Sequence, residues 1–261
     1  MVQFKGVVFD WAGTMVDFGS RAPMGAFVEA FESFGVTISA EQARGPMGLP
    51  KRDHIATLLV DPTIASNWAA ATGSPADEAA IDRIYEIFVP LNEDVVTHYA
   101  DLVPGAIETV RYLRARNIKI GSTTGYVRSI MERVIPLAAK QGYEPDNLVC
   151  SDDLPEGRPG PLGMYQCFID LVAYPPSAVI KVDDTAPGIA EGVAAGCVTV
   201  GVALSGNVVG LSHEELADLP LEKIEILRQE ATRMLKNAGA DHVIDSVADL
   251  PDLISQLEKN L

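Results

Sequence analysis

Short runs of β-branched and apolar residues, separated by segments of helical periodicity, constrain the fold of this chain most strongly. The runs lie at residues 7–9, 118–120, 148–149, 179–182 and 198–200. Strands that alternate with helices predict a parallel sheet, covered by helices on both faces, with ligands bound at the carboxyl ends of the strands. We therefore expect an α/β fold and look for chemistry where each strand ends.

The interval between the first two runs, residues 10–117, is far longer than the crossover of an ordinary βαβ unit. Much of it reads as helix, and Pro104-Gly105 marks the return to the sheet. We predict an inserted helical cap domain over residues 21–100 and a Rossmann-like α/β core domain over residues 1–20 and 101–261. The expected cap helices cover residues 24–34, 51–59, 64–71 and 75–98.

The charge of the chain limits the partners that it can bind. The 261 residues carry a formal net charge of −16, with a sequence pI near 4.6. Nucleic acid and anionic membranes both require a concentration of Lys and Arg that such a surface lacks. No stretch reaches the ~18 apolar residues of a membrane span, and the apolar run at the amino terminus is too short for a signal peptide. We expect a cytoplasmic protein that binds neither nucleic acid nor membrane.

The cysteines agree with a reducing compartment. Cys150, Cys167 and Cys197 are odd in number, lie in apolar segments and lack the C-x-x-C spacing of a zinc site. We predict that all of them are reduced and buried.

Chemically useful side chains follow the first two predicted strands. Asp10 comes directly after the first strand and precedes Gly13, whose turn exposes backbone N–H groups. An Asp in this position acts as a nucleophile or simply caps the turn, and the residue alone does not decide between these roles. The second strand ends in the run Gly-Ser-Thr-Thr-Gly-Tyr at residues 121–126, whose hydroxyls and glycines can approach a phosphoryl group.

Two further strand ends carry charges of opposite sign. Asp183 and Asp184 follow the 179–182 run, and adjacent acids there suit Mg²⁺, which prefers a few carboxylate oxygens plus water and phosphate. Arg158, in a Gly-Arg-Pro sequence after the 148–149 run, supplies a cation that can neutralise a dianionic group and support an attacking carboxylate. The sequence therefore predicts a magnesium-dependent phosphoryl-transfer site.

Asp10, Thr124, Arg158 and Asp184, in this order at four strand ends, resemble the four motifs of the haloacid dehalogenase superfamily, which has a helical cap inserted after its first motif. The resemblance covers nearly the whole chain. It implies that Asp10 is a covalent nucleophile and that Thr124 and Arg158 bind the phosphoryl group. The Mg²⁺ ligands that it implies are Asp10, the Ala12 carbonyl and Asp184, with Asp183 supporting the metal.

Ala12 bears on which bond is broken. Phosphatases and mutases of this superfamily carry a second Asp at that position, and losing such a general acid costs ~10²–10⁴-fold in rate. A carbon leaving group needs no such proton if a protonated imine beside it accepts the electrons, and that imine requires a lysine. Lys51, which opens a predicted cap helix, meets this need. His54 shares its helix face and is placed to move protons, although it is equally suited to be a packed helix residue.

Four motifs together resemble the phosphonatases, members of the superfamily that hydrolyse the carbon–phosphorus bond of phosphonoacetaldehyde. They are Asp-Trp-Ala-Gly-Thr from residue 10, Pro-Met-Gly-Leu-x-Lys from residue 46, Gly-Ser-Thr-Thr-Gly-Tyr from residue 121 and Gly-Arg-Pro from residue 157. The resemblance implies a Lys51 Schiff base, an Asp10 aspartyl phosphate and a place in 2-aminoethylphosphonate degradation. We expect Arg52 and partial desolvation to lower the pKa of Lys51. The expected substrate contacts are Thr124, Gly125, Tyr126, Arg158, Met47 and Gly48.

Other functions stay open at this point. A sugar-phosphate mutase or monoester phosphatase of the same superfamily would leave Lys51 unexplained. A binding protein without catalysis would leave Asp10 and Arg158 unexplained. A haloacid dehalogenase proper needs no Mg²⁺, and the Asp183-Asp184 pair argues against it.

The oligomeric state rests on one amphipathic segment. The first predicted cap helix carries apolar side chains that suit packing within the cap, a contact between two copies, or both. We expect a homodimer that acts on a small phosphonate. The apolar residues concerned are Met24, Phe27, Val28 and Phe31.

Overall fold

The computed structural model describes residues 4–259, and its centre is a parallel sheet of five strands in the order β2-β1-β3-β4-β5. Most strand residues are buried, as expected where helices cover both faces. This order places β1 between β2 and β3, so that the loops after these strands meet at one edge of the sheet. The strands are β1 (Gly6–Phe9), β2 (Lys119–Ser122), β3 (Val179–Asp183), β4 (Val198–Val202) and β5 (His242–Ile244).

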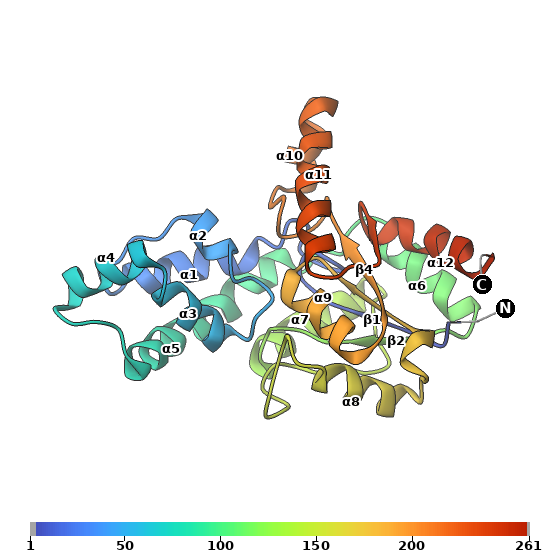
Figure 1. The fold of residues 1–261 in the computed structure, drawn as a ribbon, viewed down its shortest axis with the longest axis horizontal. Coiled ribbons are helices and arrows are strands. Elements are labelled where there is room, and N and C mark those ends of the chain that lie inside the picture. Colours follow the sequence, from blue (N-terminus) through green and yellow to red (C-terminus); the bar gives the residue numbers. More distant parts are fainter. Residues whose placement is uncertain (1–3, 260–261) are drawn as a thin grey trace.

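Helices cover both faces of this sheet (Figure 1). Because side chains alternate along a strand, Val7 and Phe9 face one helical layer, whereas Val8 faces the other. The layer on Val7 and Phe9 comprises α6 (Ala106–Ala115), α7 (Arg128–Lys140) and α12 (Leu250–Lys259). The layer on Val8 comprises α8 (Leu162–Leu171) and α9 (Ala186–Ala195).

The remaining core elements lie at the β5 edge or link the layers. The long helix α11 (Leu221–Asn237) packs against β4 and β5 at one end and projects from the core beside α10 (His213–Ala217) (Figure 1). Two single-turn 3₁₀ segments, η2 (Pro176–Ala178) and η3 (Val247–Asp249), precede β3 and α12.

A helical lobe, called the cap from here on, is inserted between β1 and β2 and extends to one side of the sheet (Figure 1, blue to teal). Its centre is the pair of α1 and α5, with α3 packed on α5. The predicted α/β core with helices on both faces and an inserted helical cap is therefore confirmed. The cap elements are α1 (Ala22–Glu32), α2 (Ala40–Arg44), α3 (Lys51–Leu59), α4 (Pro62–Thr72), α5 (Glu78–Val95) and η1 (Val96–Tyr99).

The apolar residues of α1 are used inside the cap. Met24, Phe27 and Phe31 are buried, and Val28 is half-buried. Phe27 stacks on Phe88 of α5, with ring centroids 4.2 Å apart. The homodimer therefore stays a prediction that these side chains do not by themselves support.

The predicted strand at residues 148–149 is wrong, because that segment makes only an isolated bridge to the chain just beyond β2. Side chains occupy the outer edge of β2 instead. Asp146 Oδ2 accepts a hydrogen bond of 2.9 Å from Ile120 N, and Asn147 Oδ1 accepts one of 3.2 Å from Ser122 N. These bonds satisfy donors that a sixth strand would otherwise pair with its backbone.

Two predictions made from composition can be compared with the structure. Cys150, Cys167 and Cys197 are free and buried, as predicted. Among residues 4–259, no helix combines the length and the apolar character that crossing a membrane requires.

Candidate active site

The site lies at the carboxyl edge of the sheet, where a small cleft lies between the core and the cap. Residues from both sides line it, so the structure brings together most of the residues that the sequence singled out. His54, Asp183 and Asp184 do not line this cleft. The core contributes Asp10, Ala12, Ser20, Thr124, Gly125, Tyr126, Arg158 and Thr185, and the cap side contributes Pro23, Met47, Gly48 and Lys51.

Asp10, which lines the cleft, forms a buried group of carboxylates with Asp183 and Asp184, and each offers an oxygen within 4.8 Å of the others. Burial and the charge of Asp183 raise the pKa of Asp10 to about 6. Burial and the charge of Asp10 raise the pKa of Asp184 well above its ordinary value. Carboxylates this close repel one another, and a divalent cation among them relieves that repulsion. This set of oxygens therefore fits Mg²⁺.

Core hydrogen bonds hold Asp184 in place. Thr14 Oγ1 donates to its Oδ1 at 3.1 Å, and the backbone N of Asn207 donates to its Oδ2 at 2.7 Å. Gly13 has a φ of 82°, and a Cβ on it would lie 2.3 Å from Asp184 Oδ2. Only glycine fits there. Gly13 was identified from the sequence, whereas Thr14 stood in a motif without a role of its own and Asn207 was missed.

Both carboxylate oxygens of Asp183 contact other residues of the protein. Its Oδ1 accepts hydrogen bonds from the Thr185 backbone N at 3.0 Å and from Thr185 Oγ1 at 2.7 Å. Its Oδ2 lies 3.2 Å from Arg158 Nη2 and 3.1 Å from Lys181 Nζ. Burial favours a raised pKa, but the charges of Arg158 and Lys181 outweigh it, so that the pKa of Asp183 is lowered. These contacts suit an acid that supports a metal site from behind.

Arg158 and Thr124 face the nucleophile position. Arg158 Nη2 lies 2.9 Å from Asp10 Oδ1, and both side chains are almost fully buried. Thr124 Oγ1 accepts a hydrogen bond of 3.1 Å from Tyr126 N, which leaves the hydroxyl proton for an acceptor in the cleft. Together these groups can neutralise and donate to the oxygens of a phosphoryl group.

Lys51 opens α3 and is only 4% exposed. Its Nζ lies 3.7 Å from Met47 Sδ and 4.8 Å from the ring centroid of Tyr126, so its surroundings are apolar and aromatic. Burial lowers the pKa of Lys51 to about 8, with Asp10 opposing and Arg158 adding to this change. A larger fraction of this amine is therefore neutral and nucleophilic near pH 7.

Arg52 does not act as expected. Its Nη2 lies 2.7 Å from Glu78 Oε2 and its Nε lies 2.8 Å from Asp82 Oδ1. Both acids belong to α5, and the ion pairs are exposed. The cation that lowers the pKa of Lys51 is Arg158. The expectation fails because consecutive helix residues point about 100° apart, so that Lys51 and Arg52 face different surroundings.

Two glycines let the cap loop approach the core. Gly48 has a φ of 94°, and a Cβ on it would lie 2.3 Å from Thr185 Oγ1. A Cβ on Gly125 would lie 2.9 Å from the carbonyl oxygen of Leu49. The predicted contacts Gly48 and Gly125 therefore close the cleft by allowing backbones to meet.

His54 is fully buried within the cap, behind Lys51. Its Nε2 lies 2.9 Å from the Ala43 carbonyl oxygen, and its ring stacks on Phe27 with centroids 4.0 Å apart. Burial and the charge of Lys51 hold the pKa of His54 well below its usual range. This placement matches the packed helix residue that the sequence left open, and a catalytic role for His54 stays a prediction.

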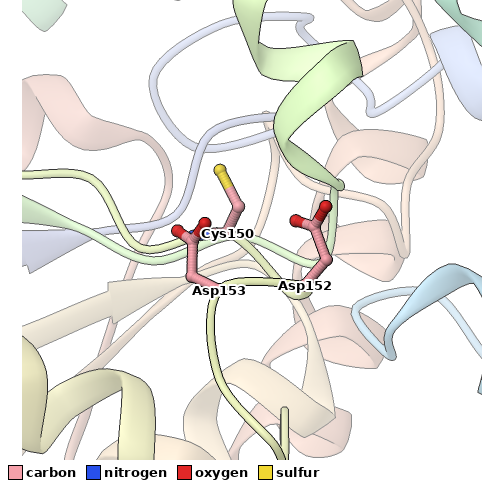
Figure 2. Close-up of side chains that lie close together, drawn as sticks. All are labelled: Cys150, Asp152 and Asp153. Atoms are coloured by element: carbon pink, nitrogen blue, oxygen red, sulfur yellow. The ribbon is translucent and has the colours of Figure 1, made fainter.

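A second group of potential ligands lies beyond the cleft. Figure 2 shows the carboxylates of Asp152 and Asp153 on either side of the Cys150 thiol. Asp153 already pairs with Arg128, and burial raises the pKa of Cys150 to about 12, so that the thiol keeps its proton. This group is therefore a poor metal site, because a thiol must lose its proton before it can bind a metal ion.

The comparisons with known proteins agree with this geometry. A family model described as haloacid dehalogenase-like hydrolase matches residues 4–196. A phosphonoacetaldehyde hydrolase from Paraburkholderia phytofirmans is 48% identical over 261 residues, which cover 100% of this chain and 98% of that protein. One from Salmonella typhi is 45% identical over 263 residues, with the same coverage of 100% and 98%.

A solved structure is similar at the level of the whole fold. It is that of a phosphonoacetaldehyde hydrolase-like protein from Oleispira antarctica, with a TM-score of 0.97 and 40% identity. The match covers 98% of this chain and 93% of that one. The chain therefore belongs to the haloacid dehalogenase-like hydrolases and, within them, to the phosphonoacetaldehyde hydrolase family.

Proposed function

We propose that this protein hydrolyses the carbon–phosphorus bond of phosphonoacetaldehyde to acetaldehyde and phosphate. The observation that carries the proposal is the placement of a buried amine and a buried carboxylate in one cleft. Lys51, with a pKa of about 8, reaches the cleft from the cap, and Asp10 reaches it from the core. The relatives named for this reaction, at 44–48% identity over nearly the whole chain, support the same reaction here.

The reaction begins at Lys51. Its neutral amine adds to the aldehyde carbon and water leaves, which forms an imine that is protonated on nitrogen. The apolar surroundings formed by Met47 and Tyr126 favour the neutral amine that this addition requires. The imine places an electron acceptor two bonds from phosphorus.

Asp10 then attacks phosphorus through a carboxylate oxygen. The carbon–phosphorus bond breaks, and its electron pair moves onto carbon and into the iminium, so that an enamine remains on Lys51. Arg158 and the Thr124 hydroxyl hold the phosphoryl oxygens during this transfer. Mg²⁺ held by Asp10, Asp184 and the Ala12 carbonyl would screen the negative charges of nucleophile and phosphonate.

Two hydrolyses complete the cycle. Water cleaves the aspartyl phosphate at Asp10 and releases phosphate. Protonation of the enamine carbon restores the imine, and a second water releases acetaldehyde and the free amine of Lys51. No step requires an acid at Ala12, because the leaving group receives its electrons through the imine.

The setting of this reaction follows from its substrate. Removal of the amine of 2-aminoethylphosphonate yields this aldehyde, so we place the enzyme in 2-aminoethylphosphonate degradation. We infer a cytoplasmic homodimer that binds neither nucleic acid nor membrane. The free buried cysteines support a reducing compartment, and the net charge of −16 supports the lack of polyanionic partners.

Product analysis tests the proposal. The protein is incubated with phosphonoacetaldehyde and Mg²⁺, and acetaldehyde and phosphate are each measured with time. We expect equal amounts of both products, loss of turnover with a chelator, and little release of phosphate from an aryl phosphate. Turnover of the aryl phosphate at the higher rate, with no acetaldehyde from the phosphonate, would show a monoester phosphatase instead.

A further inference from the structure

We propose that Glu191 is a positioning residue that fixes the guanidinium of Arg158 against Asp10, acting together with Lys181 and Thr123. The inference rests on the proposed function, in which Arg158 binds the phosphoryl group. Glu191 lies on α9 and does not line the cleft that holds Asp10 and Lys51. It therefore acts on the reaction through the residues that it contacts, and of these Arg158 is the one that lines the cleft.

Glu191 gathers three donors on one carboxylate oxygen. Its Oε2 accepts hydrogen bonds from Arg158 Nε at 3.0 Å and from Thr123 Oγ1 at 2.8 Å, and it lies 3.1 Å from Lys181 Nζ. Glu191 is 2% exposed and Lys181 is fully buried. Charged groups removed from water in this way must be paired, and here they are paired with one another.

The Thr123 hydroxyl completes the network. Its Oγ1 accepts hydrogen bonds from Arg158 Nη2 at 2.8 Å and from Lys181 Nζ at 2.6 Å, while it donates to Glu191. A hydroxyl has one proton and two lone pairs, so all of its capacity is used and its orientation is set. Thr123 and Thr124 thus serve opposite sides of one loop, with Thr124 facing the cleft.

The geometry explains why a partner behind Arg158 matters. On the cleft side, Arg158 Nη2 faces two acids, Asp10 at 2.9 Å and Asp183 at 3.2 Å. A guanidinium held from that side alone could rotate toward either acid. Glu191 accepts a hydrogen bond from Nε, a different nitrogen of the same rigid plane, and a planar guanidinium held at two of its nitrogens has its direction fixed.

The test measures the affinity for inorganic phosphate, a direct probe of the Arg158 guanidinium that needs no turnover. Glu191→Gln keeps the size of the side chain and removes its charge. We expect phosphate binding in the presence of Mg²⁺, measured by calorimetry, to weaken by about 10- to 100-fold, with a similar loss in kcat/KM. Borohydride trapping at saturating phosphonoacetaldehyde should still label Lys51, because Glu191→Gln leaves the amine and its apolar surroundings in place.

A double-mutant cycle separates positioning from a merely structural role. If Glu191 acts through Arg158, adding Glu191→Gln to Arg158→Lys should change phosphate affinity by less than about threefold, whereas two independent substitutions would add their full effects. An equal loss in both backgrounds would overturn the proposal, as would wild-type phosphate affinity in Glu191→Gln. Failure of wild-type turnover would instead refute the proposed function and leave this binding comparison readable.

Control variants keep the test decisive. Glu258 on α12, away from the cleft, forms an ion pair with Arg116. Glu258→Gln therefore removes the charge of another ion-paired glutamate and should leave phosphate affinity unchanged. If Glu191→Gln does not fold, Thr123→Val carries the same test, because it removes the hydroxyl shared by Glu191, Arg158 and Lys181. Wild-type phosphate affinity in Thr123→Val would then overturn the proposal.

Discussion

The core and the cap contribute to the same cleft by different means. In the core, Asp10 and Asp184 follow adjacent strands. Arg158 pairs with Asp10, and hydrogen bonds from Thr14 and Asn207 hold Asp184. In the cap, one short loop and the first residue of α3 supply Met47, Gly48 and Lys51. The side chains of the core half are therefore held largely by the core itself, whereas the position of the amine depends on how the cap is placed.

The closing contact is small and directed at backbone atoms. Arg44, at the end of α2, donates from Nη1 to the carbonyl oxygens of Gly19 at 3.0 Å and Asn207 at 3.1 Å, and from Nη2 to that of Gly210 at 3.1 Å. Asn207 also donates its backbone N–H to Asp184. This contact between cap and core thus meets the loop that holds a candidate metal ligand.

The largest expected effects come from replacing Asp10 in the core or Lys51 in the cap. The two variants should differ in the partial reactions that they still carry out. Asp10→Asn and Lys51→Met should each reduce carbon–phosphorus cleavage by about 10⁴-fold or more. Asp10→Asn should still form the imine, whereas Lys51→Met should still bind inorganic phosphate with Mg²⁺. Trapping and calorimetry on both variants measure this. Substantial turnover in Lys51→Met would break the comparison.

A substitution at Ala12 tests which leaving group the core side of the site can displace. Ala12→Asp restores the acid that phosphate monoesters need, so hydrolysis of an aryl phosphate should rise by about 10²-fold. Ala12→Ser, of similar size but without an acid, is the matched control and should show no such gain. Steady-state rates with the aryl phosphate and with phosphonoacetaldehyde, measured for both variants, give the result. An equal gain in the two variants would count against this reading of Ala12.

Burial of Lys51, which belongs to the cap, destabilises the native protein at neutral pH. Burial lowers the pKa of this lysine from 10.5 to about 8, so at pH 7 the native protein must hold a charged, desolvated amine. Lys51→Met should therefore raise the free energy of unfolding at pH 7 by up to about 3 kcal/mol. Between pH 8 and 10.5 the unfolded wild type binds more protons than the native state, so its stability rises with pH and this difference shrinks.

Urea unfolding at pH 7, 9 and 10.5, without Mg²⁺, measures this difference. Lys140→Met, which removes an exposed lysine of α7, is the matched control. A difference between wild type and Lys51→Met that does not change with pH would mean that packing, rather than charge burial, separates them.

The smallest expected effect concerns the closing contact. Arg44→Met removes the hydrogen bonds to the core loop and should lower kcat by about tenfold or more, since hydrogen bonds to charged groups make a net contribution of roughly 1.5–3 kcal/mol each. Arg52→Met, which breaks an exposed ion pair within the cap, should change kcat by less than about threefold. Steady-state kinetics compare the two. Equal effects would show that Arg44 has no special part in closure.

Sequence reasoning succeeded where a residue's place in the chain determines its place in the fold. Asp10 and Asp184 directly follow buried strands, and parallel strands bring their carboxyl ends together. Lys51 follows a turn at the start of a cap helix that begins where predicted. In each case a local pattern and one topological rule suffice.

It failed where the partner is distant or is backbone. Lys181 stands in an apolar strand and Glu191 in an apolar helix, and only the fold shows that they meet at Arg158. The buried lysine was nevertheless a signal, because a charge in the middle of a core strand requires a partner. Most contacts of Arg44 leave no trace in the sequence, because backbone carbonyl oxygens accept them whatever the side chain, although the Asn207 side chain also takes part.

Borohydride reduction during turnover tests the central claim most directly. Protein, phosphonoacetaldehyde and Mg²⁺ are mixed, borohydride is added, and the modified residue is identified by peptide mass spectrometry. The account predicts one stable adduct, on Lys51, and its absence in Lys51→Met. Full turnover with Lys51 unmodified, or an adduct only on another lysine, would contradict it.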